Sequence, residues 1–134
     1  MGEDSDILTS RGAARFYLDD LQGSKDDFTQ ALELDEENVR AMNNRAVVEF
    51  CLEEYEAAKD DYAKAIEHIP SERLLLGGMA LTLHAMDNED DKAVEIWKGL
   101  IQLDPRFRDA QWTGQEMLWP EPMVNETKKL IARI

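Results

Sequence analysis

The sequence predicts an all-α fold in which helix hairpins stack into a solenoid. The first observation is a repeat, because similar side chains return at intervals of 34 residues. The series that show it best are Gly12, Ala46, Ala80; Leu18, Leu52, Met86; and Phe28, Tyr62. The second observation is composition, since 43% hydrophobic residues and only four prolines in 134 residues leave long stretches free to be helical. A period of this length is typical of arrays in which no single unit buries its own apolar face.

Each repeat unit is expected to contain two helices. The units span residues 5–38, 39–72 and 73–107. In the second unit, the first helix falls within VRAMNNRAVVEFCL and the second within YEAAKDDYAKAIEHI. Apolar residues of the second helix recur at Tyr55, Ala58, Tyr62, Ala65 and Ile66, which is the spacing of one buried helical stripe. The short break at Glu53–Glu54 then requires the two helices to pack antiparallel.

The third unit departs from the period by one residue. Ala93, Trp97 and Leu100 repeat the spacing of the buried stripe one residue late. The extra residue is therefore expected in the turn at 87–92. Because Leu100 is larger than the alanine found there in the second unit, this hairpin is also expected to be splayed.

The stretch after Pro105 no longer fits the repeat. Its two segments, RFRDAQWTGQEMLW and MVNETKKLIARI, can both be helical. We expect one or two atypical helices in 108–134 that cap the open end of the array. The residues expected to supply the apolar cover are Phe107, Trp112, Leu118 and Trp119.

The ordered set of repeating positions resembles the tetratricopeptide repeat. The matching residues are Gly12, Leu18, Leu21, Ser24, Phe28, Ala31, Ala46, Leu52, Tyr55, Ala58, Tyr62, Ala65 and Pro70. The segments ALELDEEN and AIEHIPSE are similar to the helix-ending signature of that family. The resemblance covers about residues 5–107. It implies a right-handed α-solenoid of three helix hairpins and a non-catalytic module, scaffold or adaptor for protein–protein interaction.

In tetratricopeptide arrays the first helices of successive units line a concave groove, so equivalent positions form rows across it. The resemblance implies three such rows: Thr9–Ser10, Asn43–Asn44, Gly77–Gly78; Ala13, Val47, Leu81; and Phe16–Tyr17, Phe50–Cys51, His84–Ala85. The expected contacts with a peptide or helix of a partner are Asn43, Asn44, Val47, Phe16, Tyr17, Phe50, Leu81 and His84, with Arg40 at the edge. For Gly77 and Gly78 two explanations stay open, namely close helix packing and a flat floor for a peptide.

Some proteins of this family clamp the acidic tails of chaperones with cationic and asparagine side chains. The corresponding positions here are Thr9, Ala13, Asn44, Leu74 and Gly78. Only Asn44 matches, and the three cationic positions are missing. The chain is therefore not expected to be a carboxylate-clamp binder.

Charge and composition restrict the partners further. The formal net charge is −14, so the chain should repel nucleic acids and anionic membranes and should favour a neutral or basic protein. The only cysteine is Cys51, the amino terminus lacks the features of a signal peptide, and no apolar stretch is long enough to span a membrane. We expect a soluble, cytoplasmic protein.

No residue pattern indicates a catalytic, cofactor or metal site. His68 and His84 fall in different units, and no glycine-rich phosphate loop occurs. The acidic turn 87–91 lacks a calcium-binding pattern, since Lys92 and Lys98 occupy the places of the glycine and glutamate of an EF-hand. An enzyme is therefore not expected. The alternative that stays open is a structural role, with weak self-association through the atypical end containing Trp112 and Trp119.

Overall fold

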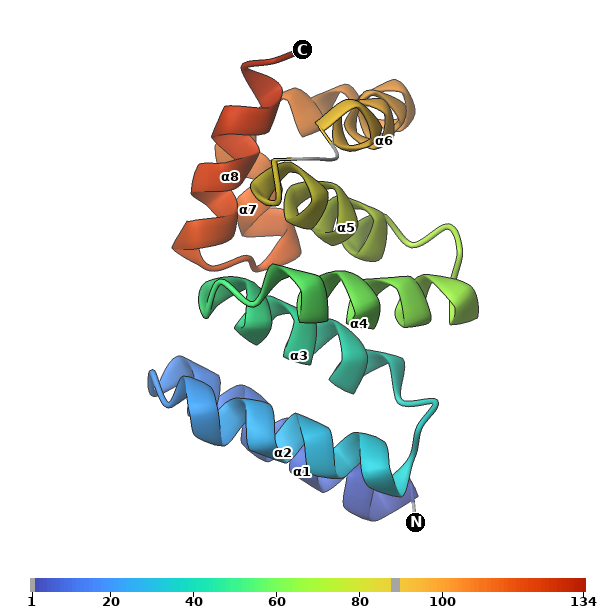
Figure 1. Ribbon diagram of the computed structural model, residues 1–134, viewed down its shortest axis with the longest axis vertical. Coiled ribbons are helices and arrows are strands. Elements are labelled where there is room, and N and C mark those ends of the chain that lie inside the picture. Colours follow the sequence, from blue (N-terminus) through green and yellow to red (C-terminus); the bar gives the residue numbers. More distant parts are fainter. Residues whose placement is uncertain (1, 88–89) are drawn as a thin grey trace.

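The computed structural model describes residues 2–87 and 90–134, which form helices joined by short turns (Figure 1). The helices are α1 (Gly2–Tyr17), α2 (Leu21–Leu34), α3 (Val39–Cys51), α4 (Tyr55–His68), α5 (Arg73–Ala85), α6 (Asp90–Leu103), the 3-10 helix η1 (Pro105–Arg108), α7 (Ala110–Met117) and α8 (Glu121–Ile131). The all-α expectation is confirmed.

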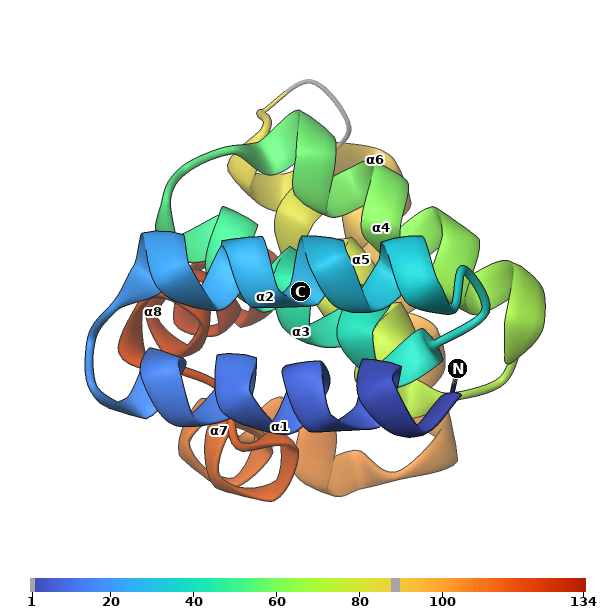
Figure 2. The same cartoon turned by 90° about the horizontal axis from the view of Figure 1, so that it is seen from below.

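The first six helices form three stacked hairpins. Within each hairpin the helices pack as neighbours, α1 on α2, α3 on α4 and α5 on α6, and successive hairpins meet through α2 on α3 and α4 on α5. Figure 2, seen from below, shows α1 and α2 lying side by side in the lowest hairpin. The expected solenoid of helix hairpins is therefore present.

The hairpin turns repeat with the same period as the helices. Each contains one residue in the left-handed region, Asp19 (φ 65°), Glu53 (φ 60°) or Asp87 (φ 64°), and these positions are 34 residues apart. Such a residue reverses the chain directly after the first helix of each unit. The break between α5 and α6 is one residue longer than that between α3 and α4, as the slip in the period predicts, although residues 88–89 of this turn lie outside the described ranges.

Small side chains allow the helices of a unit to approach closely. Ala46, Ala58 and Ala65 are fully buried, and Tyr62 fills the space beside them with none of its surface exposed. In the third unit Trp97 takes the place of Tyr62 and donates from Nε1 to the carbonyl oxygen of Phe107 at 3.0 Å. The buried apolar stripes predicted from the repeat are thus the interior of the stack.

Two ion pairs also follow the repeat. Arg11 makes a two-point contact with Asp27 (2.7 and 2.9 Å), and Arg45 makes the same contact with Asp61 (2.6 and 2.7 Å). Both carboxylates are buried, and the hydrogen bond from Arg11 lowers the pKa of Asp27. Each ion pair links the two helices of its own hairpin. The third unit has Met79 in place of the arginine, so its helices lack this link.

Glu49 is a buried acid beside the second of these ion pairs. Its side chain is 5% exposed, and its Oε1 has no hydrogen-bond partner among the described residues. Burial raises the pKa of Glu49 to about 9, and the neighbouring Asp61 adds to the rise. Burial therefore favours the neutral, protonated form of the Glu49 carboxyl.

Helix α5 is apolar around its whole circumference. Between Arg73 and His84 it has no ionisable residue, and its side chains are buried toward α4, α6 and α8. Helix α8 packs against α5, α3 and α6, and in Figure 1 it runs along the stack rather than parallel to the repeat helices. The tail therefore does more than close the last hairpin, because it returns over the first helices of two units.

Of the four tail residues expected to supply apolar cover, two are buried, one is partly buried against the core and one is exposed. Phe107 and Trp119 are buried, and Trp112 is partly buried with Arg106 stacked over its ring at 4.5 Å. Leu118 instead is 78% exposed. It ends α7 in the left-handed conformation (φ 57°), which turns its side chain away from the core and directs the following residues back toward α5.

Gly78 and Gly99 should respond to alanine in opposite directions. A Cβ on Gly78 would lie 2.3 Å from Cζ of the buried Tyr62 ring, whereas one on Gly99 would meet nothing within 4 Å. We expect Gly78→Ala to lower the free energy of unfolding by about 1–3 kcal/mol through overpacking. Gly99→Ala should raise it by about 1 kcal/mol through helix propensity. Urea unfolding of both variants measures this, and equal effects would contradict the packing role of Gly78.

Glu49→Gln should stabilise the chain increasingly as pH rises. With a folded pKa of about 9, Glu49 keeps a proton that it loses near pH 4.5 when unfolded, so its contribution to stability falls between these two values. One such proton changes the free energy of unfolding by up to about 1.4 kcal/mol per pH unit. Glutamine has no such loss, so the advantage of the variant should grow from pH 5 to pH 9 in urea unfolding. The exposed Glu67→Gln is the control, and a pH-independent difference for Glu49→Gln would show that Glu49 is already ionised.

Candidate functional site

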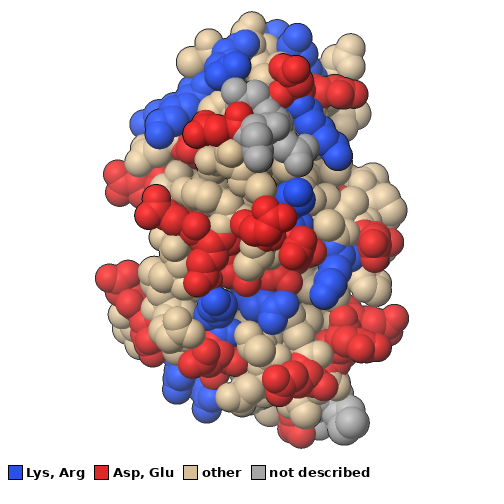
Figure 3. All heavy atoms as spheres, in the orientation of Figure 1, with Lys and Arg blue, Asp and Glu red and all other residues tan. Residues whose placement is uncertain are grey.

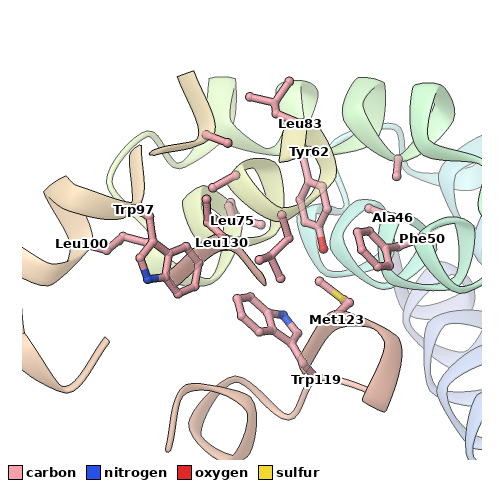
Figure 4. Packing of buried hydrophobic residues seen from close by; sticks show 14 of the residues in the cluster. Ala46, Phe50, Tyr62, Leu75, Leu83, Trp97, Leu100, Trp119, Met123 and Leu130 are labelled. Atoms are coloured by element: carbon pink, nitrogen blue, oxygen red, sulfur yellow. The ribbon is translucent and has the colours of Figure 1, made fainter. Parts of the chain in front are cut away.

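The concave side of the stack is formed by α1, α3 and α5, but part of it is filled by the chain itself. Helix α8 lies against α5 and α3, and Met123 and Leu130 on α8 are fully buried there. Figure 4 shows Trp119 and Met123 in the same buried cluster as Phe50 and Tyr62. The groove is therefore divided into a region covered by α8 and a region that remains open.

Three of the expected contact residues lie in the covered region. Phe50 is 2% exposed and Leu81 is fully buried, both in the cluster that also contains Trp119 and Met123. His84 is 8% exposed, and its Nδ1 is 2.5 Å from Oε2 of Glu126 on α8. With α8 in place none of the three offers a surface to a partner, which corrects the expected extent of the groove.

The open region is a pocket of about 200 Å³ between α1, α3, the start of α5 and the turn from α7 to α8. Its lining is Ala13, Phe16, Tyr17, Phe28, Asn43, Asn44, Val47, Leu74, Met117, Leu118 and Trp119. Five of the nine expected contact residues, namely Phe16, Tyr17, Asn43, Asn44 and Val47, are brought together here. Arg40 is exposed on α3, one helical turn before Asn43 and Asn44, and does not line the pocket.

The pocket is lined mainly by apolar side chains, and its polar groups belong to Asn43, Asn44, Tyr17 and Trp119. None of the described residues that line it is charged. The side-chain nitrogen of Asn43 donates to Oδ1 of Asn44 at 3.1 Å, while the Oδ1 of Asn43 has no hydrogen-bond partner among the described residues. The same is true of Nε1 of Trp119, whose side chain is 7% exposed. Both of these unpartnered atoms are buried, so the accessible surface of the pocket is mainly apolar.

The two glycines of α5 serve helix and ring packing. A Cβ on Gly77 would lie 2.9 Å from Cη2 of Trp119, and one on Gly78 would overlap the Tyr62 ring. Of the two explanations left open, close packing therefore accounts for both glycines. The flat floor expected for a peptide is occupied at Gly77 by the indole ring of Trp119.

The repeat pattern missed the residues that the tail contributes to the pocket. Met117, Leu118 and Trp119 form one wall, and they lie outside the repeat period. The signal that could have located them is the composition of α5, since a helix without a polar face must be covered on every side. The rows of equivalent positions do not contain this information.

Nothing in the described ranges points to reaction chemistry. Among residues 2–87 and 90–134, no group of three His, Cys, Asp or Glu side chains is placed to hold a metal ion, and the acidic turn 87–91 lies partly outside them. Burial raises the pKa of the Cys51 thiol to about 11, so it is protonated at neutral pH. No helix in these ranges is long and apolar enough to cross a membrane.

Comparison with solved structures identifies the fold. The first tetratricopeptide domain of Spaghetti (RPAP3), solved bound to the HSP90 peptide SRMEEVD, superposes with a TM-score of 0.76 over 99% of this chain and 94% of that one, at 17% identity. The Arabidopsis OM64 tetratricopeptide domain gives 0.73, at 17% identity, over 99% and 98% of the two chains. MamA gives 0.72, at 19% identity, over 97% and 78%. This chain has the tetratricopeptide-repeat fold.

The likeness concerns the fold and not the sequence. Neither a comparison with protein-family models nor one with curated proteins finds a match. The resemblance drawn from the 34-residue period is thus confirmed by shape at low identity. Of the positions that the sequence resemblance matches to the chaperone-tail clamp, Ala13 and Leu74 line the open pocket, whereas Thr9 and Gly78 are buried.

Phe50→Ala and Tyr17→Ala should separate the covered region from the open one. Phe50 is 2% exposed under α8 and Tyr17 is 78% exposed at the pocket rim. We expect Phe50→Ala to lower the free energy of unfolding by about 3–5 kcal/mol and Tyr17→Ala to change it by no more than about 0.5 kcal/mol. Urea unfolding tests this. A mild effect of Phe50→Ala would mean that α8 does not cover the groove in solution.

Proposed function

We propose that the chain is a non-catalytic interaction module that binds a peptide segment of a partner protein in the open part of its concave groove. The observation that carries this proposal is the pocket between α1, α3 and the α7–α8 turn, where apolar side chains surround Asn43 and Asn44. The solved relative bound to an HSP90 peptide has the same fold, which supports peptide binding as the use of this surface.

The segment we propose is not an acidic chaperone tail. Cations at the clamp positions would have to neutralise its carboxylates, and here those positions hold Thr9, Leu74 and Gly78. The net charge of −14 adds repulsion at longer range. Figure 3 shows acidic side chains over much of one face, with basic side chains prominent near the end formed by α6 and α8. A neutral or basic segment is the better partner, and nucleic acid is disfavoured for the same reason.

Self-association through the tail remains the alternative. The tryptophans that suggested it are less available than the sequence implies, because Trp119 is buried and Trp112 is partly covered by Arg106. The exposed Leu118 is the residue that still favours it. Sedimentation over a range of protein concentrations distinguishes the two, since a strict monomer excludes self-association as the main function.

The double variant Tyr17→Ala with Asn44→Ala should lose the partner while staying folded. Tyr17 is exposed and Asn44 is partly exposed, so neither supports the core. We expect micromolar binding, about 8 kcal/mol, for the wild type and at least tenfold weaker binding for the variant. The measurement is quantitative affinity capture from a cell extract, followed by titration of the captured protein.

The matched control is Gln102→Ala with Leu103→Ala, which removes an exposed polar and an exposed apolar side chain from α6. A partner that both double variants retain equally would place the binding surface elsewhere. A partner lost only with the change at Tyr17 and Asn44 supports the groove.

A further inference from the structure

The first hairpin forms one end of the stack, and Figure 2 looks onto this end with α1 and α2 in front. Ile7 and Ala14 on α1, and Leu18 directly after it, lie in one row at helical spacing. All three are exposed, Ile7 to 61% and Leu18 to 80%. We propose that this row is an interaction surface that binds the same row of a second copy of the chain, with the two α1 helices antiparallel about a two-fold axis.

The repeat identifies this side of α1 as the side that binds a neighbouring hairpin. One and two periods after Ile7 and Ala14 stand Ala41, Val48, Leu75 and Thr82, all at most 2% exposed. They lie on α3 and α5, which stack on α2 and α4 of the preceding hairpins. Arg45, in the same row of α3, donates to Oγ1 of Thr29 on α2 at 3.3 Å. The row that is buried between hairpins in the second and third units is thus exposed on α1.

The two ends of the stack differ in how their apolar side chains are covered. The outer unit of a helical array normally has a polar outer face. At the far end, η1 and α8 pack against α6 and supply the cover. On α1 no described helix covers Ile7 and Leu18, so water meets apolar side chains in a row that is otherwise interior. Burying this row against another helix would remove apolar surface from water.

The charges along α1 favour an antiparallel pair. The acidic residues of α1 all precede Ile7 and its two arginines follow it, so the two halves of the helix have opposite charge. With 3.6 residues per turn, Asp4 and Arg15 lie on the same flank of the apolar row. Two helices related by a two-fold axis bring the same flanks together, so Asp4 of each copy faces Arg15 of the other. Arg15 is 39% exposed and only 3.4 Å from its partner Asp27, which leaves it free to turn toward a second carboxylate.

The other end of the stack does not offer a matching surface for α1. Val94 and Lys98 on α6 line a hollow together with Arg133 from the end of the chain. Allowing for the one-residue slip, Lys98 stands where the first hairpin has Thr29. A head-to-tail stack would therefore set Lys98 beside Arg11, and like charges there disfavour an open filament. A closed dimer through α1 avoids this contact.

The first test measures the dimer and its dependence on the apolar row. One helix face is smaller than a standard interface, so we expect a dissociation constant of about 10–100 μM. Sedimentation of the full chain over a concentration range that brackets these values measures it. Ala14→Glu adds a charge to the row on both copies and should weaken the dimer at least tenfold. The matched control is Ala63→Glu, the same change at an exposed position of α4, which should leave the dissociation constant unchanged.

The second test determines the orientation of the two copies. Ile7→Cys and Ala14→Cys chains, one of them labelled with 15N so that their masses differ, are mixed under mild oxidation. In an antiparallel pair Ile7 of one copy lies near Ala14 of the other, so the mixed disulfide should exceed both symmetric ones in mass spectrometry. The wild type, whose only cysteine is Cys51, gives the background. This test also applies where Ala14→Glu lowers stability in urea unfolding.

Four results would overturn the proposal. The first is a strict monomer over the whole range, and the second is an excess of symmetric disulfides, as parallel helices would give. The third is a dimer that survives Ala14→Glu but is lost with Leu118→Glu, because the contact would then lie in the tail. The fourth is a monomer whose Ala14→Glu variant loses a captured protein, which would assign the row to a different protein. Ala14 does not line the open pocket, so each of these results leaves peptide binding in the groove to its own test.

Discussion

The structure depends on the requirement that α5 be covered on every side. From Leu74 to Leu83 this helix presents no charged side chain to water, and the residues buried along it point in all directions. Helices α4 and α6 cover two sides, as the second helices of neighbouring units do in any such stack. The third side faces the concave surface, where a regular array would leave it open. The chain meets this requirement by returning α8 over it.

The same requirement explains the composition of the pocket. Gly77 leaves room for the indole of Trp119. Helix α8 begins just after Trp119 and packs against α5 and α3, with Met123 and Leu130 buried in the same cluster. Helix α8 does not cover the concave surface of α1 and of the neighbouring part of α3, which therefore line the open pocket. The pocket therefore has a floor from the repeats and a wall from the tail, and its two parts come from segments about 100 residues apart.

The 34-residue period was sufficient to predict the hairpins, their buried stripes and the one-residue slip in the third unit. It also predicted that Asn43, Asn44 and Val47 face the concave side, and these residues of α3 do line the open region. It misplaced Phe50 and Leu81 because a row of equivalent positions treats α3 and α5 as alike. The compositions of α3 and α5 differ. The absence of charged residues from the middle of α5 indicates that another part of the chain must cover this helix. The direction of α8 was not predictable, since it depends on the left-handed Leu118 and on prolines outside the repeat.

The repeats and the tail contribute different parts of the structure. The repeats set the shape of the groove, and the tail supplies one wall of its open pocket. Side chains that build the hairpins, such as Ala46, Tyr62 and Ala65, are buried and set only the shape of the groove. Trp119 and Leu118, by contrast, line the open pocket and lie outside the repeat period. The stack has the tetratricopeptide shape at 17% identity to a domain solved with a bound peptide, so most of its side chains can differ without a change of fold. The pocket lining shows the same separation, because Leu74 and Ala13 contribute apolar surface there while the buried side chains of the hairpins keep the fold.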